Sequence, residues 1–90
     1  MRVTVRLFAR LRDIAGVGEL QRDVPANAVV ATVWRALVAD YPEMAPYESS
    51  ISAAVNADYT RMDAAVADGD EVAFLPPVSG GAFVTPAVLV

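Results

Sequence analysis

The segment from Leu75 to Gly81 holds the residues of this chain whose types and order are best suited to chemistry. It reads Leu-Pro-Pro-Val-Ser-Gly-Gly. Two prolines fix φ and remove amide donors, so the segment should leave the preceding strand as an extended arm. At about 3.3 Å per residue, the stretch from Pro76 to Gly81 can reach about 20 Å. Gly80 and Gly81 have no side chains, so a narrow channel could admit them and a nucleophile could approach the terminal carbonyl. An acyl-transfer handle needs these properties.

Three side chains that often perform nucleophilic or acid–base chemistry, those of His, Cys and Lys, are absent from the sequence. The 90 residues contain no His and no Cys, and all seven basic residues are arginine. Thiolate nucleophiles, disulfides, Cys/His zinc sites, imidazole catalysis and lysine Schiff bases are therefore excluded within this chain. Any proton transfer must be done by a partner, and we expect no bound cofactor or metal.

Charge and hydropathy exclude two further classes of partner. The net charge is −4 and the arginines are scattered, which argues against a nucleic-acid footprint. Residues 1–8 alternate charged and apolar side chains, unlike a signal peptide, and the apolar run at residues 82–90 is too short to span a bilayer. We therefore expect a cytoplasmic location and no membrane partner.

The hydrophobic pattern predicts the elements that must position the arm. Alternation with a period of two predicts strands, and apolar residues at i, i+3, i+4, i+7, i+8 and i+11 predict one main helix. The expected strands are residues 2–7, 19–24, 51–56, 59–60 and 71–75, and the expected helices are a short turn at 9–15 and the main helix at 30–41. Asn27 and Thr32 are both candidate N-caps of that helix, and Pro42 should end it. Residues 43–50 should be irregular.

Two turns complete this order of elements, at Asn56-Ala57-Asp58 and at Asp68-Gly69-Asp70. The sequence predicts one α+β domain of the β-grasp type, with a helix packed across a mixed sheet whose first and last strands lie together. Trp34 lies on the apolar face of the helix and should belong to the core.

The alternation also predicts an apolar surface near the arm. Phe8 and Leu75 end their strands on the parity opposite the core, and Tyr59 could join them. The three side chains could form a docking patch, because large apolar groups dominate interfaces, or they could be incidentally exposed. Arg10 and Arg12 could guide docking or could be solvated surface charges.

Three segments resemble the molybdopterin synthase small subunits, which are ubiquitin-like sulfur carriers. Residues 68–81 (DGDEVAFLPPVSGG) resemble the C-terminal signature of that family. Ala54-Val55-Asn56 and residues 7–13 (LFARLRD) resemble its other recurring segments, and the three occur in the family's order along residues 1–81.

The resemblance implies a sulfur carrier in molybdenum cofactor biosynthesis, a sulfurtransferase subunit with no catalysis of its own. Gly81 would be adenylated with ATP by an E1-like activating enzyme and converted to a thiocarboxylate by a sulfur donor protein, with Gly80 giving access. The arm would enter the large subunit and give its sulfur to cyclic pyranopterin monophosphate. The residues implied in partner binding are Phe8, Tyr59, Leu75, Pro76, Pro77, Val78 and Ser79.

The chain departs from this family after Gly81. Members of the family end at the glycine pair, whereas this sequence continues with Ala82 to Val90. We expect residues 1–81, with the arm at 75–81, to form the carrier domain. The extension at 82–90 could be a removable tail, the start of a following domain, or a sign that the chemistry has been lost. In the first two cases cleavage after Gly81 is needed.

Three other functions fit the same features. A thiamin-pathway sulfur carrier has a similar fold and terminus, although it lacks the Phe-Leu-Pro-Pro that precedes the arm here. A ubiquitin-like modifier would join Gly81 to a target lysine instead of yielding sulfur. A plain β-grasp interaction module would use the glycine pair only as a linker.

Overall fold

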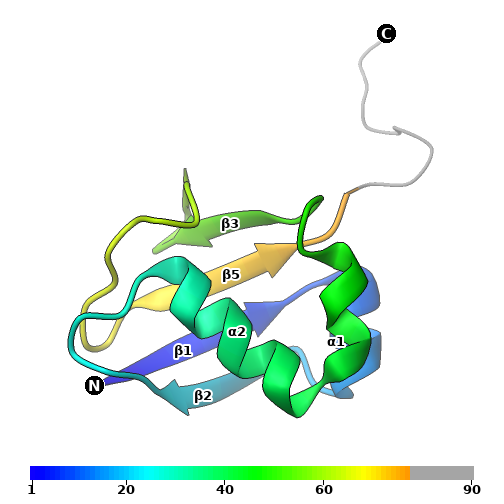
Figure 1. Ribbon diagram of the computed structural model, residues 1–90, viewed down its shortest axis with the longest axis horizontal. Coiled ribbons are helices and arrows are strands. Elements are labelled where there is room, and N and C mark those ends of the chain that lie inside the picture. Colours follow the sequence, from blue (N-terminus) through cyan, green and yellow to red (C-terminus); the bar gives the residue numbers. More distant parts are fainter. Residues whose placement is uncertain (78–90) are drawn as a thin grey trace, which may run out of the picture.

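The computed structural model describes residues 1–77, which form a five-stranded sheet crossed on one face by a helix (Figure 1). The strands are β1 (Arg2–Leu7), β2 (Glu19–Asp23), β3 (Ser52–Val55), β4 (Asp58–Thr60) and β5 (Glu71–Leu75). The helices are α1 (Ala9–Ala15), α2 (Val30–Asp40) and the 3-10 helix η1 (Pro42–Tyr47). The predictions made for Val78, Ser79, Gly80, Gly81 and residues 82–90 fall outside the described residues.

The order of strands in the sheet is β2-β1-β5-β3-β4. β1 and β5, the first and last strands in sequence, are parallel neighbours, with Val5 opposite Val72 and Leu7 opposite Phe74. The other pairings, β1 with β2, β3 with β4 and β3 with β5, are antiparallel. The predicted α+β fold of the β-grasp type is confirmed, and the predicted strands and main helix are correct to within one residue at each end.

The core lies between the sheet and α2, and strand alternation decides which residues enter it. Val3, Val5 and Leu7 of β1 are all buried on the helix side of the sheet. The rings of Trp34 and Phe74 pack with their centroids 5.2 Å apart, and Trp34 is a core residue as predicted. The alternate residues of the strands therefore lie on the opposite face of the sheet.

The start of α2 differs from the prediction that Asn27 or Thr32 is its N-cap. The N-cap is Val29, whose N–H donates to the Thr32 Oγ1 at 3.1 Å. The next two amides, of Val30 and Ala31, donate to the carbonyl oxygens of Ala64 (2.9 Å) and Met62 (2.8 Å). Both candidates were wrong because backbone from the connection between β4 and β5 satisfies helix amides that a capping side chain usually serves.

Residues 43–50 were predicted to be irregular, and this was wrong for residues 43–47. Together with Pro42 they form η1, in which Pro42 occupies an initial position where its fixed φ suits a helix and its missing N–H leaves no donor unpaired. Met44 is fully buried in the core. The helical turn therefore places one apolar side chain in the core.

The turn between β3 and β4 contains two residues with positive φ. Asn56 has φ 50° and Ala57 has φ 74°, as a two-residue type I′ hairpin turn requires. The side chain of Asn56 also accepts a hydrogen bond from the Glu71 N–H and donates one to Asp70, each at 3.0 Å. Asn56 is therefore well suited to its position, whereas Ala57 is strained.

Ala57→Gly should stabilise the domain by about 1 kcal/mol, because glycine adopts positive φ without the steric clash of a Cβ atom. Such a change raises the Tm of a domain of this size by about 4–8 °C. Ala57→Val is the matched control and should destabilise the domain, since branching at Cβ makes positive φ more costly. Thermal unfolding of the two variants measures both effects. Equal Tm values would contradict the prediction.

Candidate functional site

The sheet face opposite α2 carries a hollow close to the root of the arm. Four cross-strand neighbours form a row across this face of the sheet. They are Arg6 on β1, Ala73 on β5, Ala54 on β3 and Tyr59 on β4. Small side chains in the middle of the row and large ones at its ends leave a cavity of about 240 Å³. Its lining residues are Arg6, Phe8, Ala54, Ala57, Tyr59, Glu71, Ala73 and Leu75.

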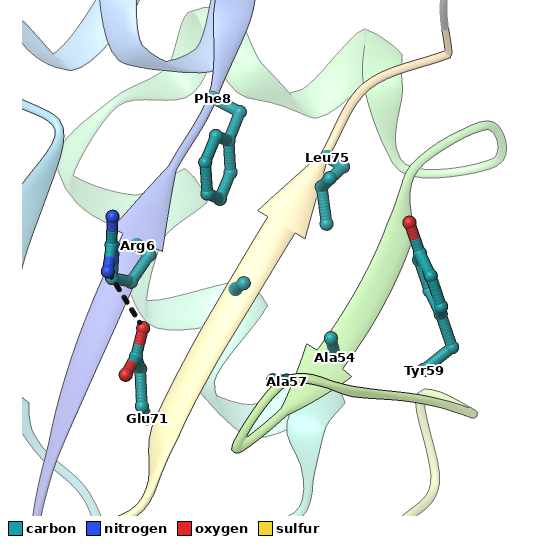
Figure 2. A pocket seen from close by; sticks show the side chains of 8 residues that line it. Arg6, Phe8, Ala54, Ala57, Tyr59, Glu71 and Leu75 are labelled. Atoms are coloured by element: carbon teal, nitrogen blue, oxygen red, sulfur yellow. Dashed lines mark hydrogen bonds and ion pairs between the residues drawn. The ribbon is translucent and has the colours of Figure 1, made fainter.

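Phe8, Leu75 and Tyr59 are the large apolar walls of this hollow (Figure 2). Phe8 and Leu75 lie at one end, and Tyr59 lies on the far side of β3 from Arg6. Tyr59 is 75% exposed and Phe8 is 37% exposed. The structure thus brings Tyr59 together with Phe8 and Leu75, the two residues that strand parity placed on this face. Their part in binding stays a prediction.

The position of Phe8 follows from the way β1 ends. The backbone of Phe8 is still extended (φ −127°, ψ 153°), so its side chain points to the face opposite Leu7. The chain then turns sharply at Ala9, whose φ is 51°, and the Phe8 carbonyl accepts a hydrogen bond from the Leu11 N–H at 3.1 Å. The Arg6 guanidinium carbon lies 5.7 Å from the centroid of the Phe8 ring, a cation–π contact.

Charged side chains border the hollow on the β1 side. Arg6 Nη1 lies 3.2 Å from Glu71 Oε2, and Arg6 Nε lies 4.0 Å from Glu19 Oε1. Sequence reasoning missed Arg6, Glu71, Ala54 and Ala73. Parity alone puts each on this face, but only the strand order and register show that the four side chains meet.

A further ion pair joins β1 to β2 on the same face of the sheet, beyond Arg6 and Glu19. Arg2 Nε donates to Asp23 Oδ1 at 2.9 Å. This hydrogen bond, together with the charge of the guanidinium, lowers the pKa of Asp23, and the same contact raises the pKa of Arg2. The exposed face is therefore charged over β1, β2 and the start of β5, where Glu71 lies, and apolar where Ala73, Leu75, Ala54 and Tyr59 line the hollow.

The arm begins beside the apolar side chains that line the hollow. Leu75 lies opposite Ser52 as the last residue of β5, and it also lines the hollow. Pro76 and Pro77 follow outside the strand, as predicted, and lead away from the sheet (Figure 1). In residues 1–77, no three potential ligands gather to hold a metal ion, and no helix is long and apolar enough to cross a membrane.

Comparison with known proteins shows the same family along nearly the whole chain. The model of the ThiS family matches residues 5–81. The molybdopterin synthase sulfur carrier subunit of Arabidopsis thaliana is 35% identical over 79 residues, which cover 88% of this chain and 82% of that protein. The crystal structure of the small archaeal modifier protein SAMP1 from Haloferax volcanii has a TM-score of 0.81 and 31% identity, and the match covers 90% of this chain and all of that one.

One similar chain comes from a protein–protein complex. It belongs to the complex of subunits 1 and 2 of the molybdopterin-converting factor of Helicobacter pylori, with a TM-score of 0.62 and coverage of 90% of this chain and 100% of that one. At 24% identity this likeness shows the fold alone. The resemblance to molybdopterin synthase small subunits is confirmed by the curated relative, and the chain belongs to the ThiS family.

Proposed function

We propose that this chain is the sulfur carrier of a molybdopterin synthase and that its working group is the carboxylate of Gly81. The observation that carries the proposal is the family match, which begins within β1 at residue 5 and ends at Gly81. The relative from Arabidopsis thaliana, which is named as a molybdopterin synthase sulfur carrier subunit, matches 79 residues of this chain. A cytoplasmic location is part of the proposal, because the activation step consumes ATP.

The chemistry would proceed in two steps at the Gly81 carbonyl. A carboxylate oxygen attacks the α-phosphorus of ATP on an adenylating, E1-like enzyme, forming an acyl adenylate and releasing pyrophosphate. The terminal sulfur of a persulfide on a donor protein then attacks the carbonyl carbon and AMP leaves, which gives an acyl disulfide. A thiol reductant attacks the donor's sulfur in that S–S bond and forms a disulfide with the donor, and the Gly81 thiocarboxylate is the leaving group. The 90 residues contain no His, Lys or Cys, so the partners supply the acid and base groups.

The apolar hollow would serve as the docking surface of this carrier. Phe8, Leu75 and Tyr59 provide large apolar side chains at the root of the arm, where interfaces gain most of their binding energy from such groups. A protein bound over these side chains could receive Gly81 about 20 Å from the surface of the carrier, which is the extended length of the arm. In this proposal Pro76 and Pro77 hold the arm extended, and Val78 and Ser79 lie along the channel of the large subunit.

Cleavage is a necessary part of the proposal. In this sequence Gly81 is followed by Ala82, so its carbonyl belongs to a peptide bond. Adenylation needs a free carboxylate. The bond between Gly81 and Ala82 must therefore be hydrolysed before sulfur can be loaded.

Intact-mass analysis tests both requirements. The chain is incubated in an extract of its native cells with ATP, and we expect a species ending at Gly81 and a second one in which sulfur replaces one carboxylate oxygen. Omission of ATP should leave only the first species. Recovery of the uncut chain alone, from cells with active molybdoenzymes, would contradict the proposal.

A second function is favoured by the similarity to SAMP1, which is named as a modifier protein. In that case the activated Gly81 would form an isopeptide bond with a lysine of a target protein. The same mass analysis separates the two functions, because a modifier appears as a Gly81 adduct on lysine-containing peptides of other proteins.

A further inference from the structure

We propose that the extension at residues 82–90 binds back over the hollow of its own uncut chain and leaves the hollow when the chain is cut after Gly81. The carrier thus covers its own docking surface until its working carboxylate is released. Occupancy of the hollow is a property of this chain alone, and only its consequence for partners rests on the proposed function.

The hollow is an apolar surface that residues 1–77 leave open to solvent. Ala54 and Ala73 lie in the middle of its lining, between larger side chains, and its volume is about 240 Å³. Tyr59, which forms one of its walls, is highly exposed. Contact of such a surface with water is unfavourable, so an apolar segment that reaches the hollow is stabilised by covering it.

The extension has the composition of an apolar segment. It reads Ala-Phe-Val-Thr-Pro-Ala-Val-Leu-Val and contains no charged side chain. Its large apolar side chains are those of Phe83, Val84, Val88, Leu89 and Val90. The extension therefore matches the hollow in hydropathy and brings no charge that would need a partner there.

The lengths of the arm and the extension allow this contact. Leu75 is a wall of the hollow, and the six residues that follow it up to Gly81 have an extended length of about 20 Å. The nine residues after Gly81 can span about 30 Å. Even from the tip of a fully extended arm, the chain can therefore return to Leu75 with three residues left to cover the hollow. Gly80 and Gly81 can adopt the positive φ angles that a reversal of direction requires.

The covalent link favours the extension over a separate molecule as the occupant. A short tether holds its two ends at an effective concentration in the millimolar range, about 3 mM. A contact with a Kd of about 1 mM is then formed in about three quarters of the uncut chains. After cleavage between Gly81 and Ala82 the tether is lost, and the released peptide dissociates at micromolar concentrations of protein. One hydrolysis thus frees both the carboxylate and the docking surface.

The NMR signals of alanine methyl groups provide the first test. The uncut chain is compared with the same chain ending at Gly81, with no partner present. We expect cleavage to shift the signals of Ala54 and Ala73, which line the hollow, at least about fivefold more than those of Ala36 and Ala39 on α2, across the sheet. Equal shifts of the two pairs would overturn the proposal.

Substitutions within the extension separate its hydropathy from its length. Phe83→Ser with Leu89→Ser removes two large apolar side chains, whereas Ala82→Ser with Ala87→Ser adds the same hydroxyl groups at small residues. In the uncut chain, the first pair should move the methyl signals of the hollow to their positions in the cut chain, and the second pair should leave them unchanged. The same effect from both pairs, or no effect from either, would contradict an apolar contact.

The consequence for partners is measured by calorimetry with the large subunit of the same organism. Affinity falls in proportion to the fraction of chains whose hollow is open, so the uncut chain with Phe83→Ser and Leu89→Ser should bind at least about threefold more tightly than the uncut wild-type chain. The two chains have the same length, so a clash of the extension with the large subunit affects both. Equal affinities would overturn this consequence. If the chain ending at Gly81 does not bind at all, the proposed function is wrong, whereas the NMR result on occupancy stands.

Discussion

Gly81→Phe should slow sulfur loading of the chain cut after residue 81 by at least about a hundredfold. A benzyl side chain at the tip would obstruct a channel shaped for bare backbone and would displace the reacting carbonyl, and misplacement by about 1 Å can already cost this much. The rate of thiocarboxylate formation is followed by intact mass in the presence of ATP, the activating enzyme and the sulfur donor.

Glu43→Phe serves as the control for this substitution. It introduces the same side chain at an exposed position of η1, which contributes no lining residue to the hollow. We expect it to load sulfur at the wild-type rate. Unchanged loading of Gly81→Phe would contradict the proposed role of the tip, since the reaction would then tolerate bulk at the reacting residue.

Phe74→Ala should destabilise the domain by about 3–5 kcal/mol, as deletion of a fully buried aromatic ring generally does. Phe74 has no exposed surface, and its ring packs against Trp34. Domains are stable by only about 5–15 kcal/mol, so a large fraction of the stability would be lost. Denaturation followed by the fluorescence of Trp34, the only tryptophan of the chain, measures the change.

Phe8→Ala makes the same chemical change on the other face of the sheet. Because Phe8 is partly exposed at the hollow, we expect it to lose less than about 1 kcal/mol of stability while weakening binding of the large subunit. If the two variants were equally stable, the assignment of Phe74 to the core and Phe8 to the surface would be wrong.

The strands, the main helix and the core could be predicted because the spacing of apolar residues within each short segment indicates its structure and its buried face. The alternation in residues 2–7 places Val3, Val5 and Leu7 on one face whatever the rest of the chain does. The same reasoning placed Phe8 and Leu75 on the opposite face, and the structure confirms both. The assignment of Trp34 to the core followed from the spacing of apolar residues along the main helix.

The features that could not be predicted depend on residues distant in sequence. Nothing near Val29 shows that the carbonyl groups of Met62 and Ala64 will complete the first turn of α2. The hollow likewise requires that Arg6, Ala73 and Ala54 become neighbours, and three different strands contribute them. Strand order and register determine which of these distant residues come into contact, and a local sequence pattern specifies neither of them.

The place of β5 has a consequence for how the chain is made in the cell. Among the strands of residues 1–77, β5 is the last to be synthesised, yet it is the central one, and within this part of the chain it joins the β1–β2 pair to the β3–β4 pair. Until Glu71–Leu75 has emerged from the ribosome, β1 and β3 each present an unpaired edge to which other nascent chains could add. Folding must wait for this late, long-range pairing. A transcript truncated before residue 71 would therefore yield material prone to aggregation, for which chaperones and proteases would compete.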